Sequence, residues 1–178
     1  MPPKRHMPLC PSAIAVSKPK RDTWMEEELL DTLIPWDPNA QIKPSGFPGV
    51  LLVYTKLDPY QLGRIISSGY HAFVKRVVPA QRCLISPSRH DLLREIEEIV
   101  MKYRPGRIRL STSIRGTGKT IITHSVIEEF LRGLNVVIYR KSKTMLCIES
   151  VNELFIITLG EARFCGPDCI MIIQSHSK

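Results

Sequence analysis

The sequence has no long hydrophobic run. No apolar stretch approaches the ~20 residues that a membrane-spanning helix needs. Pro8, Cys10 and Pro11 interrupt the stretch after the basic start, where a secretory signal would carry its apolar core. A hydrophobic content of 43% in 178 residues is typical of a globular protein with one ordinary domain or two small ones. We therefore expect a soluble, cytoplasmic protein without a membrane partner.

Motifs for metal binding and catalysis are lacking as well. Of the five cysteines only Cys165 and Cys169 are close together, and their C-x3-C spacing without a second pair or a histidine is a poor zinc signature. Buried thiols or one local disulfide are the alternatives for this pair. The five histidines show no metal-ligand spacing, and neither a G-x-S-x-G elbow nor a G-x-G-x-x-G motif after a strand occurs. We predict no catalytic residue, no metal and no cofactor.

Acidic residues are scarce between Lys102 and Lys143. This segment holds ten Lys or Arg but only Glu128 and Glu129 as acidic residues, a net charge of +8, whereas the rest of the chain carries 15 residues of each sign. Solubility does not require such a concentration of charge, but binding to a polyanion does. The distribution favours nucleic acid as a partner, with an ordinary basic surface as the alternative.

Hydrophobic periodicity and turn residues predict a β-α-β-β-α-β order in the first part of the chain. The signals include a capping box from Thr23 to Glu26, a helix stop at Pro35, and the N-cap Asp58 followed by Pro59 at the first helical position. The expected strands cover 12–18, 40–43, 49–55 and 73–85, and the helices cover 23–34 and 58–69. This order is that of the ferredoxin-like split βαβ arrangement.

A second α/β unit is predicted from Ser88 onward. Ser88 opens a helix that Pro105 ends, and a further capping box from Ser125 to Glu128 opens a helix with Gly133 at its C-cap. The expected strands cover 107–115, 136–139, 145–149, 154–159 and 169–173, with a hairpin tip at 151–152. The fold class is therefore α+β. We expect a disordered basic tail over 1–11 and two domains, over 12–86 and 87–178.

The strand over 107–115 alternates between apolar and polar residues. Arg107, Arg109, Ser111, Ser113 and Arg115 point to one side, and such guanidinium and hydroxyl groups suit contacts to phosphates. An exposed strand face that is basic without binding anything is the alternative. Because these side chains point away from the apolar side, we expect the fold to survive their removal. The predicted RNA-binding residues are Arg107, Arg109, Ser111, Arg115, Lys119, Thr120, Arg140, Lys141 and Lys143.

The segment Gly-Thr-Gly-Lys-Thr over 116–120 looks like a phosphate-binding P-loop between a strand and a helix. The P-loop motif G-x4-G-K-[ST] requires glycine at position 113, which is Ser113. No later apolar strand ends in an Asp that could hold Mg²⁺, and the remaining chain has hairpin-like strands instead of further βα units. We therefore predict no NTP binding, whereas backbone N–H groups and Lys119 remain able to contact RNA phosphate.

Several passages carry a resemblance to a known family. In the second part they are Glu128-Glu-Phe-Leu-Arg-Gly133, Thr144-Met-Leu-Cys-Ile-Glu-Ser150 and Glu153-Leu-Phe-Ile-Ile-Thr-Leu159. Residues from about 88 to 175 thereby resemble the THUMP domain of 4-thiouridine synthetases, tRNA methyltransferases and tRNA cytidine-acetylation adaptors. The passages 49–55, 57–60 and 75–79 resemble the ferredoxin-like partner domain of the stand-alone acetylation adaptor. The chain departs from the family over 112–123, where many THUMP domains have a basic pair followed by an aromatic residue and proline.

The resemblance implies a protein that is not itself an enzyme. It implies binding of tRNA at the acceptor region and 3′ end, and presentation of that tRNA to a separate modification enzyme such as the acetyltransferase that forms N4-acetylcytidine. A basic strand and loop can read the backbone and shape of A-form RNA without a sequence code, which agrees with this function. The alternatives are a nucleotide-binding enzyme that uses the 116–120 loop, and an RNA-associated structural protein without tRNA preference.

Overall fold

The computed structural model describes residues 10–166 and 170–174. These residues form a mixed sheet of ten strands with five helices, which confirms the α+β fold class predicted from the sequence. The basic tail predicted over 1–11 lies outside the described residues except for Cys10 and Pro11.

The first part of the chain, residues 12–86, begins with the predicted β-α-β-β-α-β order. Its elements are β1 (Ala13–Ser17), α1 (Asp22–Leu33), β2 (Gln41–Pro44), β3 (Val50–Tyr54), α2 (Pro59–Ser68), β4 (Val74–Pro79) and β5 (Arg82–Ile85). The predicted cap of α2 is confirmed, because the Asp58 side chain accepts a hydrogen bond from the Gln61 backbone N–H at 2.8 Å. The capping box predicted for α1 is wrong, because the helix already begins at Asp22 and Thr23 lies inside it.

The second part, residues 87–178, adds three helices and five strands within the described residues. They are α3 (Arg89–Tyr103), β6 (Arg107–Ser113), α4 (Gly118–Ile121), α5 (His124–Gly133), β7 (Val137–Ile138), β8 (Thr144–Val151), β9 (Leu154–Phe164) and β10 (Ile170–Gln174). Ser88 opens α3 as predicted and forms a capping box with Asp91. The capping box predicted at Ser125 is wrong, since α5 begins at His124 without a side-chain cap.

The strand order is β2-β3-β1-β4-β10-β9-β8-β6-β7, and β5 pairs with β9. Pairing crosses the predicted domain boundary twice, because β5 is antiparallel to β9 and β10 is parallel to β4. The single strand predicted over 73–85 is therefore wrong. It is two strands, separated at Ala80 and Gln81, because its two ends pair with different parts of the sheet. Backbone hydrogen bonds thus join the two parts, and their division into domains stays a prediction.

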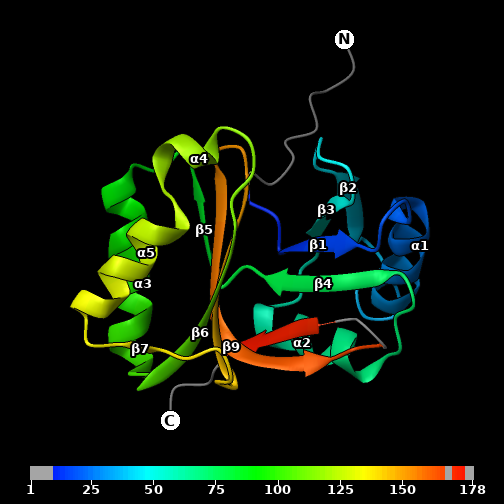
Figure 1. Cartoon of the computed structure of the whole chain (residues 1–178). Coiled ribbons are helices and arrows are strands. Elements are labelled where there is room, and N and C mark those ends of the chain that lie inside the picture. The colour runs from blue at the N-terminus through cyan, green and yellow to red at the C-terminus, as the bar shows by residue number, and fades with distance from the viewer. Residues whose placement is uncertain (1–9, 167–169, 175–178) are drawn as a thin grey trace.

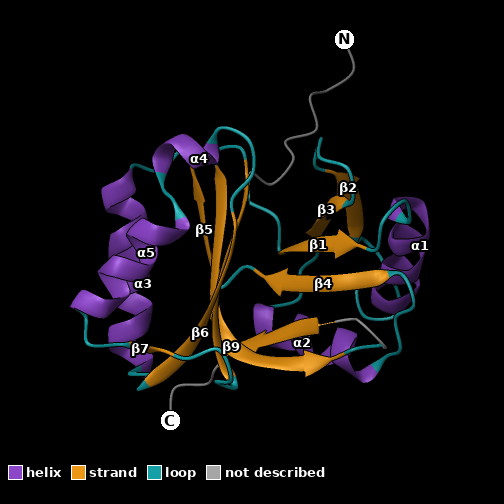
Figure 2. Cartoon of the chain, viewed as in Figure 1, coloured by secondary structure: helices purple, strands orange, loops and turns teal. Residues whose placement is uncertain are grey.

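Two pairs of helices, α1 with α2 and α3 with α5, cover opposite outer faces of the sheet (Figures 1 and 2). A hydrophobic core lies between each pair and the sheet. One core forms under α1 and α2 around Met25 and Leu62, and the other under α3 and α5 around Ile96 and Ile127. A third cluster contains Ile14, Val50, Val78, Met145, Cys147, Val151, Ile156 and Ile172. These residues come from the sides of the strands opposite to the helices, so the bent sheet packs its two inner faces against each other.

Candidate nucleic-acid interface

Strand β6 has the two faces that its alternating sequence predicts. It lies between β7 and β8 and runs parallel to both. Ile108 is fully buried in the core under α3 and α5, Leu110 packs against that core, and the Thr112 hydroxyl lies 2.8 Å from Nδ1 of His124 on α5. The opposite side of the strand carries Arg109 and the serines.

The polar face of β6 is turned toward the first part of the chain. On β4, Nη2 of Arg76 donates a hydrogen bond to Oγ of Ser113 at 2.9 Å. Arg109 and Ser111 are half-buried, and Nη2 of Arg109 lies 3.8 Å from Sδ of Met145. This face therefore lines the junction between the two parts, and it is not the open platform that the strand pattern alone indicates.

Arg115, just after β6, is held by a buried carboxylate. Its Nη1 lies 2.7 Å from Oε2 of Glu149 on β8, and Nη2 of Arg76 lies 2.7 Å from the other carboxylate oxygen. The Glu149 side chain is only 1% exposed, so the two arginines balance a charge that has left water. Removing Arg115 would leave this carboxylate with Arg76 alone, so we expect a cost in stability, and survival of the fold without Arg115 stays a prediction.

A second group of basic side chains is exposed near the start of β6. Ser142 Oγ donates to the Arg107 backbone carbonyl at 3.0 Å, and the Tyr139 N–H donates to the Ile108 carbonyl at 2.7 Å, so the segment after β7 lies beside this strand end. The basic edge, as we call this group, consists of Lys102, Arg104, Arg107, Arg140, Lys141 and Lys143. All six side chains are exposed, and none forms an ion pair with an acidic side chain in the described part of the chain.

An aromatic ring lies within the basic edge. Tyr139 is 45% exposed, and the Arg107 guanidinium lies 5.8 Å from the centre of its ring. An exposed ring next to cations is a surface on which an unpaired base can stack while its phosphate meets a positive charge.

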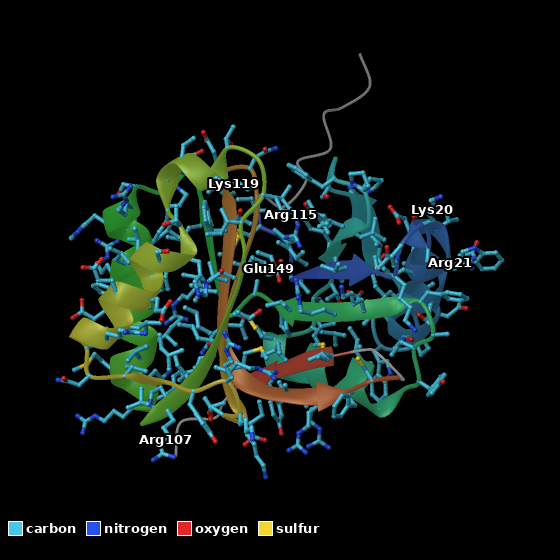
Figure 3. The ribbon with its side chains drawn as sticks, viewed as in Figure 1. Lys20, Arg21, Arg107, Arg115, Lys119 and Glu149 are labelled. Atoms are coloured by element: carbon cyan, nitrogen blue, oxygen red, sulfur yellow. A yellow bond between two sulfur atoms is a disulfide. The ribbon has the colours of Figure 1, made fainter. Side chains whose placement is uncertain are left out.

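The structure thus divides the nine residues predicted to bind RNA among three places. Arg107, Arg140, Lys141 and Lys143 belong to the basic edge. Arg109 and Ser111 line the junction, while Arg115, Lys119 and Thr120 follow the other end of β6. Figure 3 shows Arg107 at the opposite end of the second part from Arg115 and Lys119. Contact of each residue with RNA stays a prediction.

The Gly116–Thr120 loop is packed on the β8–β9 hairpin. A Cβ at Gly118 would lie 2.6 Å from the Asn152 carbonyl oxygen. The Lys119 N–H donates to the Gly116 carbonyl, the Thr120 N–H donates to the Thr117 carbonyl, and the Thr117 N–H donates to Oδ1 of Asn152. A P-loop needs such N–H groups to point at phosphate. Here they are bonded within the protein, which speaks against the nucleotide-binding alternative.

The thiol of Cys147 lies on the inner face of β8. Burial raises its pKa to about 12, and the nearby Glu149 carboxylate acts in the same direction. A thiol in this state is not a nucleophile near neutral pH. Among the described residues no group of His, Cys, Asp or Glu is arranged to hold a metal ion, and no helix there has the length and apolarity to cross a bilayer. The Cys165–Cys169 pair lies partly outside the described residues, because Cys169 is not among them.

No protein-family model matches the chain, and no curated protein matches its sequence. Among solved structures, the chain is similar to PH1313 from Pyrococcus horikoshii OT3, with 14% identity over 93% of this chain and 57% of that one and a TM-score of 0.56. The chain has a THUMP-domain fold. It spans little more than half the length of PH1313.

Two further solved structures match less well. TrmN from Thermus thermophilus is 14% identical over 83% of this chain and 44% of that one, with a TM-score of 0.49. A 4-thiouridine synthetase in complex with RNA and ATP is 13% identical over 85% of this chain and 42% of that one, with a TM-score of 0.48. The THUMP-domain fold rests on the first match.

The sequence analysis does not identify three residues that matter for the junction and the basic edge, namely Glu149, Arg76 and Tyr139. Glu149 carries a usable signal, because Cys147 and Val151, its neighbours on the same face of the strand, are apolar, and a buried carboxylate needs a cationic partner. Nothing in the sequence around Arg76 names it as that partner, since the two residues are far apart along the chain. Tyr139 ends a short apolar run, and only the pairing of β7 with β6 places its ring over Arg107.

Proposed function

We propose that this protein binds tRNA through the basic edge and presents the acceptor 3′-end region to a separate modification enzyme, for which we propose a cytidine acetyltransferase. The observation that carries the proposal is the basic edge itself. It places six exposed Lys and Arg side chains beside an exposed tyrosine, and no acidic side chain of the described chain pairs with them.

The chemistry of the basic edge suits structured RNA with an unpaired end. Lysine and arginine contacts to phosphates position a nucleic acid without reading its sequence. A-form RNA is recognised by shape and backbone, and unpaired ends are recognised by stacking on aromatic rings. Tyr139 supplies such a ring among the cations, so the edge combines both modes in one place.

The proposal includes that the chain does no chemistry on the RNA. Glu149 is tied to two arginines and Cys147 has a strongly raised pKa, so both groups serve the structure. In this proposal a second protein carries out the modification. The need for a second protein is tested by measuring tRNA modification with the purified chain alone and with the chain plus the candidate acetyltransferase. We expect modified tRNA only when the acetyltransferase is added.

Binding is tested with the double variant Arg140→Ala/Lys141→Ala. Loss of two phosphate contacts should weaken tRNA binding by about tenfold or more and make the salt dependence shallower by about one to two in the log–log slope. Binding is measured by filter retention at several salt concentrations, on intact tRNA, on tRNA without its single-stranded 3′ end, and on unstructured RNA of equal length.

The matched control is Arg132→Ala on α5. Arg132 is exposed like the edge residues, but Nη2 of Arg132 lies 2.6 Å from Oε1 of Glu128, so its charge is already balanced. This variant should bind tRNA as the unaltered protein does. Equal binding by the double variant and the control would overturn the proposal. Equal affinity for tRNA and unstructured RNA would favour a general RNA-associated protein instead.

A further inference from the structure

A cleft of about 670 Å³ lies beside the N-terminal end of α1. Its walls are the turn after β1 together with the first turn of α1, the Pro48–Gly49 turn before β3, and Lys75 on β4. Figure 3 shows Lys20, which lines this cleft, far across the view from Arg107 in the basic edge. The cleft therefore belongs to a different surface from the one that the proposed function uses.

The cleft is preformed because Asp22 ties its walls together. The Asp22 carboxylate accepts hydrogen bonds from Oγ of Ser17 at 3.0 Å and from the Gly49 N–H at 2.7 Å. Gly49 has a φ of 74°, and a Cβ there would lie 3.2 Å from Oγ of Ser17. A side chain at this position would be strained and would crowd that link. The one acidic group of the lining is thus occupied in holding the walls.

The rest of the lining includes two cationic side chains and one aromatic ring. Lys20 and Lys75 are exposed, and neither forms an ion pair with an acidic side chain among the described residues. Trp24 is 52% exposed and rests on Phe73, with 5.6 Å between the ring centroids. The cleft thus offers two ammonium groups and a supported flat ring within one concave surface, while Pro19 and Pro48 close it with apolar walls.

We propose that this cleft binds one unpaired nucleotide of the RNA, with its base stacked on Trp24 and its phosphate between Lys20 and Lys75. A stacking ring beside cations is how proteins hold single-stranded nucleotides, and the volume lies within the range of sites for small ligands. The proposal rests on the proposed RNA binding for the source of the nucleotide. A free nucleotide has the same chemistry, and the experiment separates the two sources.

The test uses the fluorescence of Trp24. The chain has two tryptophans, and Trp36, which is 61% exposed and lies beyond the C-terminal end of α1, is replaced by Phe so that Trp24 alone reports. Cytidine monophosphate, inorganic phosphate and a short single-stranded oligocytidylate are titrated into this protein. We expect quenching by the nucleotide and the oligonucleotide, with the oligonucleotide binding about tenfold more tightly because its backbone makes further contacts.

Variants of the lining locate the bound nucleotide. Lys20→Ala and Lys75→Ala should each weaken quenching by about tenfold, the scale of one charged hydrogen bond, and Lys20→Arg should restore most of the affinity. The matched control is Lys56→Ala, an exposed lysine just beyond β3 at the strand end opposite to Gly49. Circular dichroism verifies that each variant is folded.

Three outcomes would overturn all or part of the inference. Absence of quenching by both ligands, or quenching unchanged in the folded Lys20→Ala and Lys75→Ala proteins, shows that the cleft holds no nucleotide. Equal affinity for the mononucleotide and the oligonucleotide assigns the cleft to a free nucleotide and overturns the RNA source. The Arg140→Ala/Lys141→Ala variant keeps the fluorescence response while losing tRNA affinity, so failure of the basic edge and failure of the cleft are distinguishable.

Discussion

Glu149 is a charge almost fully removed from water, and Arg76 and Arg115 make its burial tolerable. Each arginine reaches a different carboxylate oxygen at 2.7 Å, from opposite parts of the chain. A buried ion pair adds little to stability relative to apolar packing, but removing one partner leaves an uncompensated charge. The ion pairs of Glu149 therefore favour the native packing of the two parts. Only this packing brings both the Arg76 and the Arg115 guanidinium groups to the carboxylate.

Replacing Arg115 by Ala should lower the free energy of unfolding by about 2–3 kcal/mol, because Glu149 keeps only one of its two partners. Urea unfolding followed by circular dichroism measures the change. Arg132→Ala, which removes one exposed ion pair, should shift the free energy by less than about 1 kcal/mol. In the Arg115→Ala/Glu149→Gln double variant the two losses should add to less than their sum. Full additivity, or an unchanged midpoint for Arg115→Ala, would contradict the role given to this ion pair.

At the scale of elements, the sequence predicts those helix starts that depend only on a few neighbouring residues. The caps of α2 and α3 are found because Asp58 and Ser88 bind N–H groups three residues ahead, which is a property of a few neighbouring residues. The same reasoning fails at Thr23 and Ser125, because α1 and α5 begin one residue earlier, at Asp22 and His124, which puts both hydroxyl residues inside the first turn. The strand predicted over 73–85 is divided because distant strands decide the pairing, and no local pattern records them.

The candidate site shows the same limit. The alternation along β6 gives the correct side for Ile108 and for Arg109. It does not say what covers the polar side, because β4 reaches that side through the bend of the sheet. The basic edge likewise gathers residues from the end of α3, the start of β6 and the segment after β7. The sequence shows that the segment from Lys102 to Lys143 is rich in positive charge. It does not show that these six side chains lie together, because their position depends on the parallel pairing of β6 with β7.

Gly118→Ala tests whether the 116–120 loop needs glycine for packing. The added Cβ would lie 2.6 Å from the Asn152 carbonyl oxygen and 2.7 Å from Oγ of Ser150, so the loop must shift from the hairpin. We expect a loss of about 1–3 kcal/mol of stability in urea unfolding. Gly133→Ala is the matched control, since nothing lies within 4 Å of its Cβ, and it should be neutral or stabilising. Equal effects of the two changes would argue against tight packing of the loop.

At the scale of the whole molecule, a strand pairing and a disulfide connect segments that lie far apart along the chain. β10 returns from the second part to pair with β4, and Cys10, just before β1, forms a disulfide with Cys83 on β5. β5 belongs to the first part but pairs with β9 of the second part, so the disulfide attaches the start of the described chain to a strand that is hydrogen-bonded to the second part. The sequence does not indicate this bond, because the two cysteines are 73 positions apart and only the fold brings their Cα atoms to 6.0 Å.

The disulfide should contribute to the stability of the whole fold. A cross-link over a loop of this length restricts the unfolded chain and is worth about 4 kcal/mol in the chain-entropy description. Cys10→Ser and Cys83→Ser should therefore each lower the midpoint of thermal unfolding, on the order of 10 °C for a chain of this size. The Cys10→Ser/Cys83→Ser double variant should lose little more than either single variant, because all three lack the same bond. Scanning calorimetry under non-reducing conditions measures these midpoints. Midpoints equal to that of the unaltered protein, or losses that add fully in the double variant, would show that the two cysteines act separately and that the bond does not stabilise the fold.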